Sequence, residues 1–249
     1  MLHAGLLRPP GAGDKPPPVD WVTRFRELQQ SARDPRLKAY YAAGMVGADT
    51  PLADTPLMAL DVETTGLDPV HDGIVSIGLV PMRLDIVRAS ASRYRLLRPR
   101  VPLGAESVTI HGITDTQIAS APDLDEILGE LLQAIAGHVL VVHCSAIERQ
   151  FLDGALAPRI GERIAFPVID TMELEARLHR GQRPTLWDRL RGHRPARLSI
   201  RLAASRARYG LPRYRPHHAL TDALASAELL QAQVAHRFTA QTPVRELWT

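Results

Sequence analysis

The sequence predicts an α/β protein with a mixed five-stranded sheet flanked by helices. Five short segments have the apolar composition of buried strands. These segments are residues 57–63, 74–82, 91–97, 139–144 and 166–170. The first three have short connections, which is typical of an antiparallel meander, whereas the last two alternate with helical patterns. With 45% hydrophobic and 23% charged residues, the composition is that of a globular protein and excludes a disordered chain, a collagen-like rod and a coiled coil.

The first 56 residues differ in character from the rest of the chain. Residues 1–18 are rich in proline and glycine, which predicts an irregular tail. Residues 20–45 carry Trp21 and Phe25 at helical spacing and are expected to form one or two helices, followed by a turn-rich connector over 48–56. We therefore expect a tail and helical extension over 1–56, one domain over 57–240 and a C-terminal tail over 241–249.

Helical patterns account for most of the remaining domain. An amphipathic helix is expected over 124–135, ending near Gly137. Further helices are expected after the fourth strand, through residues 151–152, and over 171–179, 199–209 and 219–237. The arginine-rich stretch 180–197 contains glycines and prolines and is expected to be an excursion from the core.

Positive charge is concentrated in one part of the chain. Between Arg177 and Arg215 there are twelve arginines and one acid, Asp188, so this window carries +11; because the whole chain carries +3, the remainder carries −8. A basic block on an acidic protein is expected of a phosphate-binding surface. The alternative is a solvated face in a chain that uses arginine instead of lysine.

Neither a secretory signal nor a membrane span is expected. The longest apolar stretches fall far short of the roughly 20 residues that cross a bilayer, and the N-terminus lacks the features of a signal peptide. The single cysteine, Cys144, cannot form an internal disulfide. These features predict a cytoplasmic protein without a membrane partner.

Two acids at the end of the first predicted strand are the first candidates for chemistry. Asp61 and Glu63 are two positions apart, so their side chains project from the same face of the strand. Two adjacent carboxylates on a core strand are costly unless they are neutralised. No lysine or arginine is near in sequence, so Mg²⁺ or Mn²⁺ is the natural partner. The alternative is an exposed strand end with solvated acids.

Two further segments are weaker signals when each is taken alone. The Thr64–Leu67 turn contains Gly66, which lets the backbone approach a phosphate or sugar, although a plain turn has the same composition. His217 and His218 lie in a loop just before Asp222, at the start of the last predicted helix. A histidine can act as a base at neutral pH, but most histidines in proteins are structural or solvated.

Four motifs together resemble one family. They are LDVETTGLDP (60–69), VTIHGITD (108–115), VLVVHCSAIERQFL (139–152) and HHALTDA (217–223). The order is that of DEDDh exonucleases, and the chain is similar to the proofreading exonucleases typified by the epsilon subunit of bacterial DNA polymerase III, over about residues 57–236. The resemblance implies a ribonuclease H-like fold and removal of nucleotides one at a time from 3′ ends with two metal ions.

The resemblance also implies a role for each matching residue. The carboxylates that would hold two divalent cations, Mg²⁺ or Mn²⁺, about 3.5–4 Å apart are Asp61, Glu63, Glu148 and Asp222. His217 would take the proton from the attacking water. The residues expected at the 3′-terminal nucleotide are Thr64, Thr65, Gly66, Leu67 and His111.

The second motif departs from the family pattern. Family members usually show His-Asn-x-x-Phe-Asp, whereas this chain has a cysteine, Cys144, in place of the asparagine and a glutamate, Glu148, in place of the aspartate. Glu148 keeps the charge and adds one methylene of reach, so we expect metal binding to be retained with an altered affinity for the second cation. The alternative is that Glu148 is a solvated helix residue and the activity is weak.

The sequence thus predicts a metal-dependent 3′→5′ exonuclease acting in proofreading or repair. Nucleic acid with a 3′ end is the expected substrate, with single-stranded DNA favoured, and a DNA polymerase or replisome subunit is a candidate partner. Two alternatives stay open. One is an exoribonuclease that trims RNA 3′ ends. The other is a weakly active nucleic-acid-binding accessory module, because of Cys144 and Glu148.

Overall fold

A computed structural model describes residues 19–103, 108–109, 111–180 and 198–249. The expected tail over 1–18 and nearly all of the expected excursion over 180–197 lie outside the described residues. Within the described part, no helix is both long and apolar enough to cross a membrane.

The core of the fold is a five-stranded mixed sheet, as predicted. Its strands, in spatial order, are β3 (Arg93–Leu96), β2 (Ile74–Met82), β1 (Leu57–Thr64), β4 (Val139–Val142) and β5 (Val168–Asp170). β1, β2 and β3 form an antiparallel meander, whereas β4 and β5 run parallel to β1. β1 and β4 are almost completely buried, which explains their continuous apolar runs.

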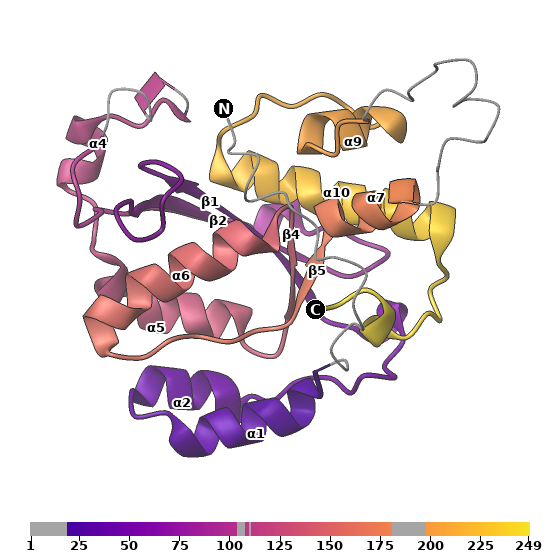
Figure 1. Cartoon of the computed structure of the whole chain (residues 1–249), viewed down its shortest axis with the longest axis horizontal. Helices are drawn as coiled ribbons and strands as arrows, with labels where there is room; N and C mark the ends of the chain where they lie inside the picture. The colour runs from indigo at the N-terminus through magenta and orange to yellow at the C-terminus, as the bar shows by residue number, and fades with distance from the viewer. Residues whose placement is uncertain (1–18, 104–107, 110, 181–197) are drawn as a thin grey trace, which may run out of the picture.

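Helices cover both faces of this sheet. They are α1 (Trp21–Ser31), α2 (Pro35–Ala42), α4 (Asp115–Ala119), α5 (Leu124–Ile135), α6 (Ser145–Ile160), α7 (Thr171–Arg180), α9 (Leu202–Arg208) and α10 (Ala219–Arg237). Short 3₁₀ turns are η1 (Leu52–Asp54), η2 (Ala89–Ala91) and η3 (Val244–Glu246). Figure 1 shows α5 and α6 on one side of the sheet and α10 with α7 and α9 on the other. The sheet and its helices confirm the predicted fold class.

Three strands are shorter than the sequence predicts. β3 spans Arg93–Leu96 rather than 91–97, since Ala91 belongs to the 3₁₀ turn η2. β5 begins at Val168 rather than at residue 166, because Pro167 has no N–H to donate to the sheet. β4 ends at Val142, because Cys144 has a positive φ of 125° and α6 begins at the next residue.

The strand register places the two acids of β1 beyond the end of β4. The parallel pairing of β1 with β4 ends at Ala59 and Val141, so Asp61 and Glu63 continue past the carboxyl end of β4. This end of the sheet is also where α6 begins. Open α/β sheets characteristically build their ligand sites there.

Gly78 of β2 brings α10 close to the same point. It pairs directly with Asp61 across the antiparallel ladder, so the two residues share a face of the sheet. A Cβ at Gly78 would overlap the backbone of Ala219 and Leu220 at the start of α10. Only glycine therefore allows this close approach, which carries Asp222 toward the acids of β1.

The helical extension packs into the same hydrophobic core as the sheet. Phe25 of α1 is 1% exposed, and its ring centroid lies 5.4 Å from that of Tyr40 and 5.2 Å from that of Tyr41. The Tyr41 hydroxyl accepts a hydrogen bond from the N–H of Ala165, at 3.0 Å. The extension is thus an integral cover of the domain rather than a separate unit.

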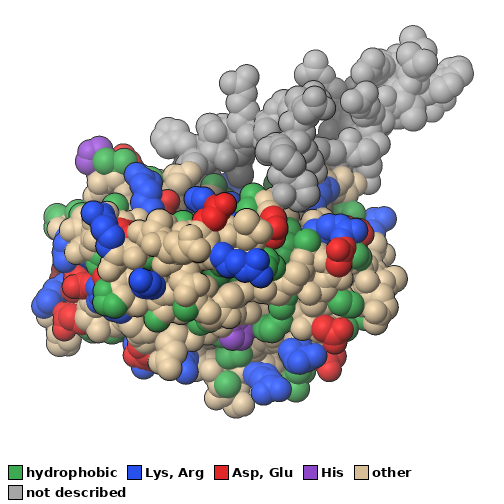
Figure 2. All heavy atoms as spheres, turned by 90° about the horizontal axis from the view of Figure 1, so that it is seen from below, with side chains coloured by type: hydrophobic (Ala, Val, Ile, Leu, Met, Phe, Trp, Pro, Cys, Tyr) green, Lys and Arg blue, Asp and Glu red, His purple; other side chains and the backbone are tan. Residues whose placement is uncertain are grey.

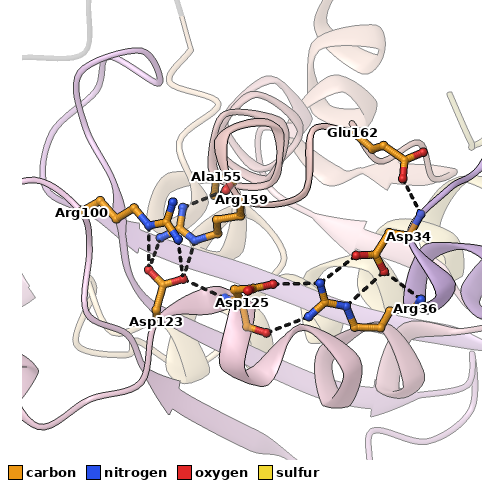
Figure 3. A network of polar contacts seen from close by, with 8 residues as sticks. All are labelled: Asp34, Arg36, Arg100, Asp123, Asp125, Ala155, Arg159 and Glu162. Atoms are coloured by element: carbon orange, nitrogen blue, oxygen red, sulfur yellow. Dashed lines mark hydrogen bonds and ion pairs between the residues drawn. The ribbon is translucent and has the colours of Figure 1, made fainter.

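Ion pairs anchor the same extension on α5 and on the segment after α6 (Figure 3). Arg36 of α2 lies 2.7 Å from Asp34 and 2.8 Å from Asp125 of α5. The Glu162 carboxylate accepts a 2.6 Å hydrogen bond from the N–H of Asp34. These contacts fix α2 against the helices that cover one face of the sheet.

The expected C-terminal tail is also packed on the domain. Val244, Leu247 and Trp248 are buried in the main core. Thr249 and Val168 exchange backbone hydrogen bonds of 2.9 and 3.3 Å, which covers part of the edge of β5. Covering a sheet edge in this way removes a surface on which other chains could pair.

Candidate active site

Four acids predicted as one site converge from three elements. Asp61 and Glu63 lie on β1, Glu148 in the first turn of α6 and Asp222 in the first turn of α10. Desolvation raises the pKa of Asp61 well above its ordinary range, and the nearby carboxylates of Glu148, Glu63 and Asp222 raise it further. The fold therefore brings four carboxylates into one electrostatic cluster around Asp61.

Burial raises the pKa of each of the other three carboxyl groups. The pKa of Glu63 rises to about 8, first because of burial and then because of the charge on Asp222. Burial likewise raises the pKa of Asp222. Glu148 is only 2% exposed, and burial followed by the charge of Asp170 raises its pKa. It is therefore not a solvated helix residue.

One carboxylate oxygen of Glu148 lacks a partner among the described residues. Its Oε2 is buried and accepts no hydrogen bond within the described part of the chain. A buried carboxylate without a compensating partner is strongly unfavourable when ionised. A cation is the kind of ligand that would satisfy this atom.

His217 lies next to two of these acids, Glu63 and Asp222. A ring nitrogen of His217 and carboxylate oxygens of Glu63 and Asp222 lie within 4.8 Å of one another, an arrangement able to hold a metal ion. The backbone of His217 is left-handed, with φ of 65°, and its N–H donates a 2.8 Å hydrogen bond to Oδ2 of Asp222. The side chain is exposed, so it can reach both the carboxylates and solvent.

The turn after β1 is built around a single carboxylate, that of Asp72. The Thr65 hydroxyl donates to Asp72 Oδ1 at 2.8 Å and accepts from the N–H of Gly73 at 3.1 Å. The Thr64 hydroxyl donates to the carbonyl of Gly66 at 2.6 Å. A Cβ on Gly66 would overlap the Asp72 carboxylate, so a larger residue here would require that side chain to shift.

The outer part of this turn presents apolar surface beside the cluster. Leu67 is 40% exposed and Val70 is 81% exposed. Gly154 of α6 supports the turn from beneath, because a Cβ there would lie 2.7 Å from the carbonyl oxygen of Pro69. The predicted 3′-end residues Thr64 to Leu67 therefore form an ordered ledge at the end of β1.

His111 is brought close to His217, far away in sequence. Its Nδ1 accepts a 3.0 Å hydrogen bond from the N–H of Ile113. Burial and then the charge of His217 lower the pKa of His111. His111 thus lies within electrostatic range of His217.

Asp170 is a site residue that the sequence reasoning missed. It ends β5, and its carboxylate accepts the N–H of Ser145 at 2.8 Å and that of Met172 at 2.9 Å, so it serves the N-termini of both α6 and α7. It also raises the pKa of Glu148. The sequence signal that could have identified Asp170 is its place between a predicted strand and a predicted helix, where aspartate commonly caps the helix N-terminus.

The unusual second motif is structurally well defined. Burial raises the pKa of the Cys144 thiol to about 11, which makes it a poor nucleophile. His143 lies 2.8 Å from the Thr171 hydroxyl and 3.0 Å from the carbonyl of Ile200, and burial lowers its pKa to about 4. His143 is thus a neutral, half-buried residue that links β4 to the segment before α9.

The interpretation of the whole arginine block as a phosphate-binding surface is wrong for members whose guanidinium groups pair with acids of the fold. Arg206 is 3% exposed, pairs with Glu228 at 2.7 Å and donates to the Ala225 carbonyl at 2.6 Å. Arg208 pairs with the buried Glu175 at 2.6 Å. These guanidinium groups neutralise acids inside the fold, a role that charge counting along the sequence does not separate from phosphate binding.

Surface charge is mixed on one face of the molecule. Figure 2 shows basic and acidic side chains interspersed on the face seen from below the view of Figure 1. Exposed arginines that remain near the acid cluster in sequence are Arg213 and Arg215, in the loop before His217. Among the described residues of the arginine block, these two lie nearest to His217 in sequence.

Sequence comparison places this domain in a known family. The RNase T model, described as Exonuclease, matches residues 58–230. A DNA polymerase III subunit epsilon-like protein of Rhodobacter capsulatus is 32% identical over 188 residues, which are 73% of this chain and 25% of the relative. A PolC-type DNA polymerase III of Bacillus cereus is 31% identical over 127 residues, 49% of this chain and 8% of the relative. The chain thus spans a quarter or less of the length of these two relatives.

Solved structures agree on the fold. The chain resembles exonuclease X in complex with 5′ overhanging duplex DNA, with a TM-score of 0.56, 22% identity and coverage of 75% of this chain and 96% of that one. The nuclease domain of 3′hExo, a DEDDh family member bound to rAMP, gives a TM-score of 0.59, 16% identity and coverage of 73% and 92%. Together, the matched family model and the shared ribonuclease H-like fold show that the chain belongs to the RNase T family of exonucleases.

Proposed function

We propose that this exonuclease hydrolyses phosphodiester bonds from the 3′ end of nucleic acid and depends on divalent cations. The observation that carries the proposal is the convergence of Asp61, Glu63, Glu148 and Asp222 with His217 at one end of the sheet. Separate elements contribute these residues, so the fold maintains an arrangement that is costly without a ligand.

The donor set fits Mg²⁺ or Mn²⁺. Oxygen donors suit these hard cations, and the partnerless buried Oε2 of Glu148 is the kind of atom a cation would satisfy. Asp61, Glu63, Glu148 and Asp222 would hold two cations. When bound, the cations would supply charge neutralisation and Lewis-acid stabilisation at the scissile phosphate. Glu148 in place of aspartate keeps the charge of this set.

The other site residues bind and orient the substrate or move protons. His217 is exposed beside the carboxylates and accepts a proton from a water whose oxygen bonds to the phosphorus. The bond between phosphorus and the 3′ oxygen breaks, and that oxygen leaves as a hydroxyl after taking a proton from solvent. The Thr64–Leu67 ledge receives the 3′-terminal nucleotide, with the exposed Leu67 against its base. His111 lies on the same side as His217 and contacts this nucleotide.

Single-stranded DNA is the proposed substrate, in proofreading or repair in the cytoplasm. The epsilon-like name of the Rhodobacter relative and the DNA in the exonuclease X complex support this choice. The same relative supports a DNA polymerase or replisome subunit as partner. The rAMP in the 3′hExo structure supports RNA 3′-end trimming as the second candidate.

The experiment compares hydrolysis by the wild-type protein with that by Asp61→Asn. We expect loss of hydrolysis in Asp61→Asn, because this residue lies at the centre of the carboxylate cluster. Asp85→Asn, at an exposed aspartate outside the cluster, is the matched control and should keep full activity. If Asp61→Asn retained most of the activity, this assignment of the site would be wrong.

A weakly active accessory module remains a second proposal, because the second motif differs from its family. The double change Glu148→Asp with Cys144→Asn restores the common motif. If the natural chain is an accessory module, the double variant should gain activity by orders of magnitude. If the site is already competent, as we propose, the double change should have little effect.

A further inference from the structure

A stacked pair of aromatic side chains lies beside the acid cluster. Tyr94 of β3 and His218 have ring centroids 4.7 Å apart and planes 18° apart. His218 is the N-cap residue of α10, and its side chain makes no capping hydrogen bond. The described contacts of the His218 ring are this stack and a 3.4 Å contact with the Thr221 hydroxyl.

The strand register shows what the pair holds. Tyr94 pairs with Gly78 on β2, and Gly78 pairs with Asp61 on β1, so the three residues form a row across one face of the sheet. The start of α10 lies directly on Gly78, which has no side chain to contact it. Stacking of His218 on Tyr94 fixes the same helix end one strand further out.

Two site residues, His217 and Asp222, depend on the position of this helix end. His217 has a left-handed backbone, which a residue with a Cβ adopts at a cost and only when its surroundings enforce it. Asp222 accepts the N–H of His217 at 2.8 Å, so the two residues move together. Burial raises the pKa of Tyr94, and the charge of Glu63 raises it further. The Tyr94 hydroxyl therefore lies within electrostatic range of the acid cluster.

We propose that the stacked rings of Tyr94 and His218 position the start of α10, so that His217 and Asp222 are held in register with the acids of β1. The inference rests on the proposed function. Tyr94 and His218 act through their neighbours and are positioning residues. Neither ring needs to touch the substrate.

The test removes the ring of His218 and then restores it. His218→Ala removes the stack, whereas His218→Phe keeps an aromatic ring on Tyr94. The control is His236→Ala, because His236 makes another aromatic contact on the same helix, 5.1 Å from the ring of Tyr209. It lies 18 residues further along α10, or about 27 Å at 1.5 Å per residue. Urea unfolding in EDTA establishes that each variant is folded.

Two readouts are measured on each variant: the kcat and KM for a single-stranded DNA oligonucleotide, and the rise in Tm on adding MnCl₂ to metal-free protein. We expect His218→Ala to lower kcat about tenfold or more with little change in KM, because small misplacements of reacting groups are costly. We also expect it to reduce the Mn²⁺-induced rise in Tm. His218→Phe and His236→Ala should resemble the wild-type protein in both readouts.

Two results would overturn the proposal. One is an unchanged kcat in His218→Ala; a raised KM alongside it would make the ring a substrate contact. The other is a His218→Phe variant as impaired as His218→Ala. If the wild-type protein hydrolyses no nucleic acid, the proposed function fails. The Mn²⁺ response alone then decides the role of the stack, and an equal rise in Tm for His218→Ala and His236→Ala would overturn it.

Discussion

Replacing Glu63 with glutamine should stabilise the metal-free protein at neutral pH. The pKa of Glu63 is raised from its ordinary value of 4.5 to about 8, first by burial and then by Asp222. The unfolded chain releases this proton near pH 4.5, whereas the folded protein keeps it until about pH 8. Between these values the folded protein binds more protons than the unfolded chain, so its stability falls as the pH rises.

The size of the effect follows from the same two pKa values. One pH unit within this window corresponds to about 1.4 kcal/mol, so Glu63 lowers the free energy of unfolding by about 3 kcal/mol at pH 7 but by only about 1 kcal/mol at pH 5. Glutamine resembles the protonated acid and does not titrate. The stability advantage of Glu63→Gln should therefore grow by about 2 kcal/mol between these two pH values.

Urea unfolding in EDTA at about pH 5 and pH 7 measures this advantage. Groups outside the acid cluster, such as the half-buried His143, contribute equally to both proteins and cancel in the difference between variant and wild type. Asp61 does not cancel: the Glu63 charge raises its pKa, so relief of Asp61 in Glu63→Gln adds to the advantage in the same direction. Glu27→Gln is the control, since the Glu27 side chain is 59% exposed on α1, outside the acid cluster, and its replacement should change the free energy of unfolding little. A Glu63→Gln protein that is less stable than wild type at pH 7, or an advantage that does not grow with pH, would refute the electrostatic account of the cluster.

Three further predictions follow from the packing and the site. Gly78→Ala should lower the free energy of unfolding by about 1–3 kcal/mol and reduce hydrolysis, because its Cβ would displace the start of α10; wild-type stability and activity would contradict this. Phe25→Ala should cost about 3–5 kcal/mol in urea unfolding, whereas Val19→Ala, at a 45% exposed site, should cost little; equal small losses would show that the extension is not part of the core. His217→Ala should strongly lower the rate at neutral pH, and an unchanged pH–rate profile would remove His217 from the role of base.

The sheet could be predicted because its signals are local. The apolar runs at 57–63 and 74–82 are long enough to be buried strands, and the structure has β1 and β2 at these places. The helix over 219–237 was predicted with the bounds that the structure has. Strand ends were less predictable where backbone geometry decides them, as at Cys144, whose positive φ ends the strand early.

The acids of the site could be named from motif order, but their supports could not. Asp61 and Asp222 are far apart in sequence, and their proximity depends on the glycine at position 78, which reads in sequence as an ordinary strand residue. Asp170 and Tyr94 act through contacts with elements distant in sequence. Such long-range contacts leave no pattern in a single chain.

The central claim, a cation-dependent exonuclease that works from the 3′ end, is tested most directly by the products formed from labelled oligonucleotides. Matched single-stranded DNA and RNA are labelled at the 5′ end and incubated with Mg²⁺, with Mn²⁺ or with chelator. We predict a ladder of 5′-labelled products that shortens one nucleotide at a time, requires a divalent cation and forms faster on DNA. A labelled mononucleotide released first, internal cleavage, or a ladder that persists in chelator would contradict the account.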